Sequence, residues 1–291
     1  MTVPANIRSF LFVPAANEKL LLSAVERSCE AIILDLEDGT HPGMRPAARA
    51  ALGQAFGRIK AAAKIAAVRI NSDLLTAVVD LHAAVRPGLD ILVLPKVEHA
   101  RDVQLLCTAV SALEQATGMP HGHVRLLLQI ESALALPRLY DIAASHPRVM
   151  GMMLGSEDFS LDCGALPTPD ALLMPSLMVL HAARAARIQP IGFVGSIADL
   201  GSAEDFKHTV ERARALGFRG AVVVHPKFLD VVNACHTPSA EQIAEARLVV
   251  EAFMAADAQG LGAIRIGALM VDKPVYRRAL DLLEEAGLSP Q

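Results

Sequence analysis

Residues 149–159 read Val149-Met-Gly-Met-Met-Leu154-Gly155-Ser156-Glu157-Asp158-Phe159, an apolar run that leads directly into a turn with two acidic residues. A second apolar run, residues 126–130, ends in the same way at Glu131. Short apolar runs are typical of strands that are buried on both faces of a parallel sheet. Because the carboxyl ends of parallel strands meet at one edge of the sheet, Glu131 and the acids of the turn are predicted to lie close together.

Six further runs of this kind alternate with longer, alanine-rich segments of helical periodicity, which is the pattern of βα units. The predicted strands are residues 9–13, 31–36, 66–70, 91–94, 126–130, 149–154, 190–194 and 221–224. Asn17, Thr168 and Ser202 stand at predicted helix starts, and Gly217 stands at a predicted helix end. Eight βα units predict an α/β fold, a closed (β/α)8 TIM barrel. An open doubly wound sheet is the alternative, but it would have a glycine-rich turn after its first strand, where this chain has none.

The barrel is predicted to comprise residues 1–236 and to be followed by a C-terminal helical extension, residues 237–291. The extension reads as a helix from Ser239, two glycines, a short apolar piece and a last helix from Pro274. Asp272 precedes that last helix. It is interpreted either as the N-cap of the helix or as a functional carboxylate in a loop.

The composition favours small-molecule chemistry. The chain has 291 residues, 53% of them hydrophobic, a net charge of −4 and a pI near 6.2, which argues against nucleic acid as a partner. No apolar run reaches the roughly 18 residues that span a bilayer, so no membrane association is expected. The N-terminus lacks the pattern of a secretory signal, and the four cysteines are far apart, so we expect reduced thiols in a cytoplasmic protein.

Acidic side chains at neighbouring strand ends repel one another unless a cation or a proton neutralises them. Two carboxylates together with water and a substrate oxygen are the usual ligands of Mg²⁺ in proteins. Glu131 and Asp158 are therefore predicted to bind Mg²⁺, which Mn²⁺ could replace. A single acid at such a position is more often a solvated loop residue or a helix cap, so the prediction depends on the several charged strand ends taken together.

Charged residues also follow other predicted strands at the same edge. Arg69 offers a permanently charged fork that binds a carboxylate or polarises a carbonyl, and it could equally pair with Glu37 or Asp38. Lys96 is expected beside the site together with Glu37 and Asp38, and a Schiff base on Lys96 would need a lowered pKa that the sequence does not indicate.

The turn itself is predicted to bind substrate. Gly155 and Ser156 are small enough for backbone amides to approach a substrate carboxylate, whereas Glu157 lines the site without an assigned role. His225 stands alone among apolar residues and is interpreted as a packed or structural histidine. The motifs of serine hydrolases, zinc proteases, P-loop NTPases and EF-hands are absent from the sequence.

At these same stretches the chain resembles the citrate lyase β-subunit-like family, the acyl-CoA lyase branch of the HpcH/HpaI aldolase superfamily. The matching segments are residues 8–14, 33–38, 68–71, 93–98, 130–131, 155–158, 224–226 and 270–274. Each segment is short, but together they span nearly the whole chain in the family's order.

The resemblance implies a barrel in which Glu131 and Asp158 hold Mg²⁺ and Arg69 grips a 2-oxo acid. It also implies coenzyme A thioesters as substrates, and Lys19 as a contact to a CoA phosphate. In such lyases the C-terminal segment covers the active site of a neighbouring subunit, where the aspartate matching Asp272 acts as acid and base. A homotrimer or a dimer of trimers is therefore expected.

The chain departs from the family pattern at four places. Ala15 and Ala221 replace a glycine and a lysine, residues 192–197 replace an acidic loop, and Gly267-Ala268 replaces Asp-Gly. These departures concern the CoA contacts and the acyl specificity. They leave the metal and arginine positions unchanged.

The leading hypothesis is a Mg²⁺-dependent carbon–carbon lyase that cleaves malyl-CoA, methylmalyl-CoA or citramalyl-CoA to an acyl-CoA and a 2-oxo acid, or forms them by Claisen condensation. One alternative is a citrate lyase β subunit that acts on a citryl-acyl-carrier protein, and another is a malyl-CoA thioesterase. A catalytically silent CoA-binding barrel is the alternative that is not an enzyme.

Overall fold

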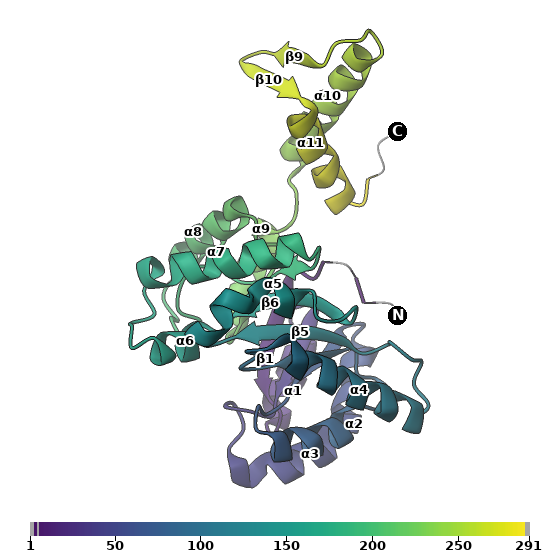
Figure 1. Cartoon of the computed structure of the whole chain (residues 1–291), viewed down its shortest axis with the longest axis vertical. Helices are drawn as coiled ribbons and strands as arrows, with labels where there is room; N and C mark the ends of the chain where they lie inside the picture. Colours follow the sequence, from purple (N-terminus) through teal and green to yellow (C-terminus); the bar gives the residue numbers. More distant parts are fainter. Residues whose placement is uncertain (1–2, 5, 289–291) are drawn as a thin grey trace. The chain divides into compact units, whose positions relative to one another are not determined.

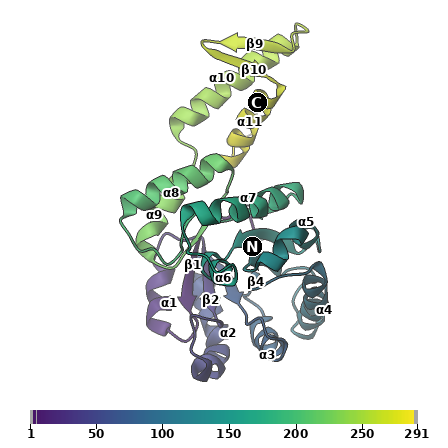
Figure 2. The same cartoon turned by 60° about the vertical axis from the view of Figure 1, so that its left-hand side comes forward.

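The computed structural model describes residues 3–4 and 6–288. The chain forms two compact units, Met1–Asn233 and Ala234–Gln291. In the first unit, parallel strands are hydrogen-bonded in the order β7-β6-β5-β4-β3-β2-β1-β8, and helices cover the outside of the sheet (Figures 1 and 2). The strands are β1 Ser9–Pro14, β2 Ala31–Asp35, β3 Ile65–Arg69, β4 Ile91–Leu94, β5 Arg125–Ile130, β6 Val149–Leu154, β7 Gln189–Pro190 and β8 Ala221–Val223.

The helices of this unit lie between successive strands, apart from α9, which follows β8. They are α1 Glu18–Val25, α2 Arg45–Ala61, α3 Leu74–Ala84, α4 Ala100–Ala116, α5 Leu139–Ala143, α6 Ser156–Asp162, α7 Pro169–Ala185, α8 Ala203–Leu216 and α9 Leu229–Cys235, with short 3-10 helices at Pro42–Met44, Ala133–Arg138 and Pro226–Phe228. The predicted start and end signals are confirmed. The side chains of Asn17, Thr168 and Ser202 cap α1, α7 and α8, and Gly217 ends α8 with a φ of 118°.

Backbone hydrogen bonds join the two outer strands of the sheet. The N–H of Arg219 donates to Pro190 O (2.9 Å), and the N–H of Gly192 donates to Gly220 O (2.8 Å). The sheet therefore closes, so the predicted (β/α)8 barrel is confirmed and the open doubly wound sheet is excluded. The seventh strand is shorter than predicted, because Gly192 has a φ of 136° and turns the chain out of the sheet direction.

The buried side chain of Gln189 reinforces this closure. Its Nε2 donates to the carbonyls of Ile7 (2.7 Å) and Arg219 (2.8 Å), and its Oε1 accepts from the N–H of Ile7 (3.0 Å). A Cβ at Gly220 would lie 2.2 Å from Ile7 O, so the chain can approach this closely only with glycine at this position.

A packed core fills the inside of the barrel. One cluster of buried side chains contains members from the strands or from the residues next to them, namely Ile7, Phe10, Ala31, Ile33, Ile65, Ala67, Ile91, Val93, Leu127, Met150, Met153, Ile191 and Val222. Because these side chains fill the interior, a site has to be sought at the ends of the strands.

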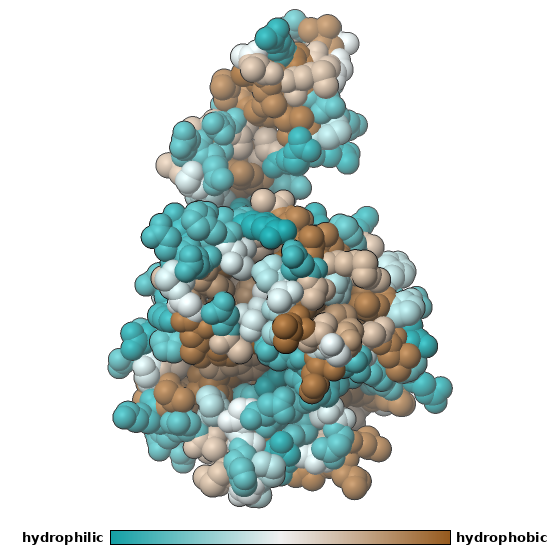
Figure 3. Space-filling view, turned by 90° about the vertical axis from the view of Figure 1, so that its left-hand side faces the viewer, coloured by the Kyte–Doolittle hydropathy of each residue, from teal (hydrophilic) through white to brown (hydrophobic). Residues whose placement is uncertain are grey.

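The second unit is a small helical and β-hairpin structure. Its elements are α10 Ala240–Asp257, β9 Ala263–Ile266, β10 Leu269–Asp272 and α11 Lys273–Glu285, and β9 and β10 pair in antiparallel orientation. The two helices were predicted, whereas β10 was not. The ring of Phe253 stacks on that of Tyr276 in its core, with the centroids 4.8 Å apart. Leu269 and Met270 are 48% and 65% exposed, and Figure 3 shows apolar residues on the surface of this unit.

A search of the described part of the chain for a helix with the length and apolar character needed to cross a bilayer finds none.

Candidate functional site

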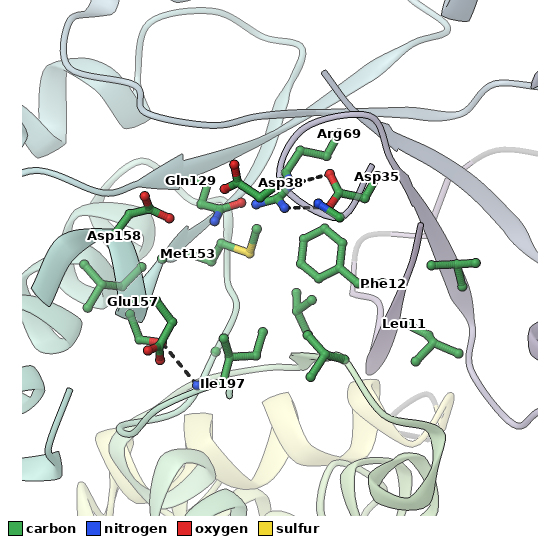
Figure 4. Close-up of a pocket in the computed structure, with 18 of the residues that line it drawn as sticks. Leu11, Phe12, Asp35, Asp38, Arg69, Gln129, Met153, Glu157, Asp158 and Ile197 are labelled. Carbon is green, nitrogen blue, oxygen red and sulfur yellow. Dashed lines mark hydrogen bonds and ion pairs between the residues drawn. The ribbon is translucent and has the colours of Figure 1, made fainter. Parts of the chain in front are cut away.

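A cavity of about 590 Å³ opens at the carboxyl ends of the barrel strands. Its lining includes residues of β1 and α1, the last residues of β2 and β3, and residues from the segments after β2, β5, β6 and β7. In the view of Figure 4, Arg69, Asp35 and Gln129 lie along one side of the cavity and Ile197 lies on the opposite side, with Met153 between them. The charged strand ends that the sequence singled out therefore meet in one place.

Arg69 is held rigidly at the end of β3. Asp35 is its partner in the register of β2, and the Asp35 carboxylate accepts from Nε (2.7 Å) and from Nη2 (2.6 Å) of Arg69. The remaining nitrogen, Nη1, lies 3.1 Å from Glu37 Oε2, and the ring of Phe12 lies 4.7 Å from the guanidinium carbon. Of the expected partners, Glu37 is confirmed. Asp35 takes the place foreseen for Asp38, because it is the residue directly opposite Arg69.

The Asp35 carboxylate is itself fixed by the backbone. It accepts from the N–H of Glu37 (3.0 Å) and from the N–H of Gly39 (2.7 Å). A Cβ at residue 39 would lie 2.4 Å from Asp35 Oδ2, so the turn after β2 needs glycine there. Asp35 is thus a site residue to which the sequence reasoning assigned no role. Its place as the last residue of a strand next to that of Arg69 was the available signal.

Glu131 is the most deeply placed acid of the site, 3% exposed. Its Oε2 accepts from the backbone N–H of Lys96 (2.6 Å), and its Oε1 accepts from Gln129 Nε2 (2.8 Å). A Cβ at Gly155 would lie 2.5 Å from Glu131 Cγ. The small size of Gly155 therefore makes room for the Glu131 side chain, a different reason from the one expected.

Lys96 joins several of the carboxylates. Its Nζ lies 2.9 Å from Glu37 Oε1, 3.6 Å from Asp158 Oδ1 and 4.0 Å from Asp38 Oδ2. Its φ of 53° is unusual for a residue other than glycine, and this conformation accompanies the hydrogen bond from its N–H to Glu131. Burial lowers the pKa of Lys96, but the hydrogen bond and charge of Glu37 outweigh it and raise the pKa above its ordinary value. A nucleophilic amine needs a lowered pKa, so the raised pKa of Lys96 does not favour a Schiff base.

The site has an excess of negative charge. Its carboxylates belong to Asp35, Glu37, Asp38, Glu131, Glu157 and Asp158, and its cations are Arg27, Arg69 and Lys96. Six minus three leaves three negative charges when all groups are ionised. Burial, followed by repulsion from Glu37 and then from Asp158, raises the pKa of Glu131 to about 8. Burial also raises the pKa of Glu37, although Arg69 opposes the shift.

A hydrated divalent cation fits this donor set. Within residues 3–4 and 6–288, no three histidine, cysteine, aspartate or glutamate side chains form a ready-made metal cage. Mg²⁺ does not need one, since it keeps several waters and takes one or two carboxylates. Glu131 and Asp158 both line the cavity, one buried and the other half-buried. Their mutual repulsion is the kind that a cation relieves.

The raised pKa of Glu131 leads to a prediction for the metal-free protein. In the unfolded chain this carboxyl would ionise near its ordinary pKa of 4.5, whereas in the fold its pKa is about 8. The folded state therefore binds the extra proton, and its stabilising effect, complete below pH 4.5, is lost as the pH rises through about 8. We expect the Tm measured in EDTA to fall more between about pH 6 and about pH 8.5 for the wild type than for Glu131→Gln. Equal falls in the two proteins would contradict the buried, protonated state.

The turn after β6 is bonded to another part of the barrel. Ser156 begins α6, and Glu157 Oε1 accepts from the hydroxyl of Ser156 (3.2 Å) and from that of Ser196 (2.6 Å). Ser156 Oγ also accepts from the N–H of Ile197 (3.2 Å). Ser156, Glu157 and Asp158 all line the cavity, and Ser196 and Ile197, which donate to Glu157 and Ser156, lie about 40 residues further along the chain.

The remaining predicted residues lie elsewhere or have simpler roles. Lys19 is not among the described residues that line the cavity, whereas Ser23 of the same helix and Arg27, two residues beyond the helix, are. His225 is exposed rather than packed. It is the N-cap of the 3-10 helix Pro226–Phe228, and its Nδ1 accepts from the N–H of Lys227 (3.1 Å). In the second unit, Asp272 is the N-cap of α11 and accepts from the N–H of Val275 (3.2 Å).

Comparison with known proteins covers almost the full length of the chain. A family model described as HpcH/HpaI aldolase/citrate lyase matches residues 8–226. The citrate lyase subunit beta of Escherichia coli strain K12 is 34% identical over 285 residues, 97% of this chain and 94% of that protein. The L-malyl-CoA/beta-methylmalyl-CoA lyase of Rhodobacter capsulatus is 30% identical over 311 residues, 98% of this chain and 96% of that protein.

A solved structure resembles the chain in the same way. The crystal structure of protein CitE from Mycobacterium tuberculosis, in complex with magnesium, acetoacetate and coenzyme A, has a TM-score of 0.73 and 28% sequence identity. The match covers 97% of this chain and 99% of that one. Similarity in sequence and similarity in fold therefore relate the chain to the same group of proteins.

Proposed function

Because the chain belongs to the HpcH/HpaI aldolase/citrate lyase family, we propose that it is a Mg²⁺-dependent carbon–carbon lyase acting on short 3-hydroxy-dicarboxylyl-CoA thioesters. Malyl-CoA, methylmalyl-CoA and citramalyl-CoA are the candidate substrates, cleaved to an acyl-CoA and a 2-oxo acid or formed from them. The observation that carries this proposal is that Arg69, fixed by Asp35, shares one cavity with Glu131 and Asp158.

The chemistry follows from the charges that develop during cleavage. The hydroxyl group of the substrate loses its proton and becomes the carbonyl of the 2-oxo acid, while the C2–C3 electron pair goes to the thioester as an enolate, which then takes up a proton. Glu131 and Asp158 would hold Mg²⁺, which would act as a Lewis acid toward the oxygens of the 2-oxo acid. Arg69 binds the carboxylate of this fragment, and Asp272 would take or return the proton.

Asp35 and Lys96 would prepare the site before substrate binds. Asp35 fixes the guanidinium plane of Arg69, so little freedom is lost when the substrate carboxylate arrives. The backbone N–H of Lys96 orients Glu131, and its ammonium group offsets part of the negative charge of Glu37 and Asp158. Both residues act on the groups that would meet substrate or metal, rather than on the substrate itself.

The cations of the cavity favour a 2-oxo acid with one carboxylate. Arg69 and Arg27 are the cationic side chains among the described lining residues, and two of the nitrogens of Arg69 are already bonded to Asp35. Oxaloacetate, the product of a citryl thioester, would bring a second carboxylate with no cation of its own. This supports glyoxylate or pyruvate as the product over the citrate lyase β subunit function. A malyl-CoA thioesterase remains the second candidate, because it would use the same groups.

We place the coenzyme A moiety along α1. Leu20 and Ser23 of this helix and Arg27, two residues beyond its end, line the cavity, and Arg27 is exposed at its surface. An exposed arginine binds phosphate oxygens well through its planar fork. In this proposal Arg27, rather than Lys19, contacts a phosphate of CoA.

Replacing Arg27 by alanine is expected to raise the KM for the acyl-CoA about 5- to 20-fold with little change in kcat, since a charged hydrogen bond contributes about 1.5–3 kcal/mol when made and less at an exposed site. Lys19→Ala is the matched control, because it removes a charge from α1, close to Arg27 in the sequence but outside the cavity lining. Steady-state kinetics at several salt concentrations measure both. A larger KM effect in Lys19→Ala than in Arg27→Ala would contradict the assignment.

The function is tested by incubating the purified protein with Mg²⁺ and a panel of acyl-CoA thioesters and identifying the products by mass spectrometry. Malyl-CoA should give acetyl-CoA and glyoxylate, and citramalyl-CoA should give acetyl-CoA and pyruvate. Free malate with free CoA would identify a thioesterase instead. Turnover of citryl-acyl-carrier protein alone would support the citrate lyase β subunit function. No reaction across the panel would contradict the lyase proposal and favour a catalytically silent CoA-binding barrel.

We also propose that the second unit, Ala234–Gln291, covers the active site of a neighbouring subunit and brings Asp272 to it, in a homotrimer or a dimer of trimers. The support comes from this unit itself: β10 exposes Leu269 and Met270, and an exposed apolar strand favours burial against another surface. Asp272 is the last residue of that strand.

A further inference from the structure

The loop between β7 and α8, residues 191–202, forms one wall of the cavity. Phe193, Gly195 and Ile197 of this loop are among the lining residues, and the loop contains no helix or strand. Figure 4 shows Ile197 next to the β6–α6 turn, with a hydrogen bond drawn to its backbone nitrogen. The position of this wall therefore depends on what holds the loop.

Its two ends are anchored independently of the site. At the start, the ring of Phe193 packs edge-on against that of Phe206, with the centroids 5.1 Å apart. Near the end, Lys227 Nζ donates to the carbonyls of Leu200 (2.6 Å) and Gly201 (3.1 Å). Both anchors lie on elements that follow the loop. Neither of them fixes Ser196 and Ile197 in the middle.

The middle of the loop is held by hydrogen bonds to the β6–α6 turn. Ser196 Oγ donates to Glu157 Oε1 (2.6 Å), Ser156 Oγ donates to the same oxygen (3.2 Å), and the N–H of Ile197 donates to Ser156 Oγ (3.2 Å). We refer to these three bonds as the latch. Among the described residues, no cationic side chain is within ion-pair distance of Glu157, so its bonds here come from neutral hydroxyl groups.

We propose that Glu157 is a positioning residue whose latch holds Ile197 against the cavity and thereby limits the length of the acyl group that the site accepts. The latch itself follows from the geometry alone, whereas the limit on the acyl group rests on the proposed lyase function. Glu157 thus acts through the loop rather than on the substrate. Its neighbour Asp158 is the residue of the turn that would hold the metal.

The latch is tested first without substrate, by hydrogen–deuterium exchange of the purified protein. In Ser196→Ala and Glu157→Ala we expect amides of residues 194–199 to exchange about 5- to 10-fold faster than in the wild type, the effect of losing one or two hydrogen bonds. Glu157→Gln is the conservative control, because its Oε1 still accepts from both hydroxyl groups, so its exchange should stay close to that of the wild type. Unchanged exchange in both alanine variants would overturn the latch.

The effect on the acyl group is tested by the ratio of kcat/KM for acetyl-CoA to that for butyryl-CoA in the condensation direction. Glu157→Ala and Ser196→Ala should lower this ratio about 5- to 10-fold, and Glu157→Gln should leave it near the wild-type value. If Glu157→Gln is as impaired as Glu157→Ala, the carboxylate charge is what matters and the positioning role is wrong. Absence of condensation in the wild type would overturn the proposed function and the acyl-group limit, while the exchange experiment would still decide the latch.

Discussion

Replacing Asp158 by asparagine is expected to lower kcat by about 10²- to 10³-fold and to weaken Mg²⁺ binding by at least about 10-fold. The substitution keeps the size of the side chain and removes one of the two carboxylate charges that would hold the metal. It also removes the charge facing Lys96 Nζ, which lies 3.6 Å from Asp158 Oδ1. Isothermal titration with Mg²⁺ and steady-state kinetics on the same preparation measure the two effects.

Asp162→Asn is the matched control for this substitution. Asp162 lies on the same helix, α6, but its carboxylate accepts from the N–H of Ala133 (2.8 Å) and is not among the described cavity residues. The amide oxygen of asparagine can accept the same bond, so activity and Mg²⁺ affinity should both be retained. If Asp158→Asn and Glu131→Gln keep full activity and EDTA has no effect, the metal has no part in the mechanism.

The barrel could be predicted from the sequence because its strands are short, apolar and evenly separated by helical segments. Burial on both faces leaves little ambiguity in such runs. The seventh strand was predicted too long, since the apolar residues around Gly192 look like a strand although the backbone turns there. Strand β10 was missed because residues 269–272 are too few and too exposed to give a clear pattern.

The charged members of the site were also recognisable, but their pairing was not. Three acids follow or end β2, and only the register with β3 decides that Asp35 lies opposite Arg69. Register depends on the packing of the whole sheet, which local sequence does not encode. The same holds for Lys96, whose left-handed backbone conformation brings its N–H to Glu131, because nothing in its neighbours indicates a φ of 53°.

Glu157 shows most clearly what local sequence leaves out. It stands next to Asp158 and has the same charge, so the sequence could only place it in the same site. Its partner Ser196 is 39 residues away, in a loop with no regular structure. The two neighbouring acids therefore take different roles because of a contact that only the folded chain creates.

Replacing Asp272 by asparagine is expected to lower kcat by about 10²- to 10⁴-fold, the usual effect of a lost general acid–base group, with little change in Mg²⁺ affinity. Asparagine is as good an N-cap as aspartate, so α11 should remain stable and the Tm should change little. This separates the two interpretations of Asp272. Unchanged kcat would mean that Asp272 is a helix cap and nothing more.

Mixing two inactive variants then tests whether the site is shared between subunits. Asp272→Asn changes only the second unit and leaves the cavity of the barrel unchanged. Arg69→Met removes the arginine of the cavity and leaves the second unit unchanged. If Asp272 of one chain serves the cavity of another, co-expressed chains of the two kinds should form some complete sites and recover part of the wild-type activity, although each variant alone is inactive. If each chain supplies its own Asp272, the mixture should stay as inactive as its components, because no chain then has both residues.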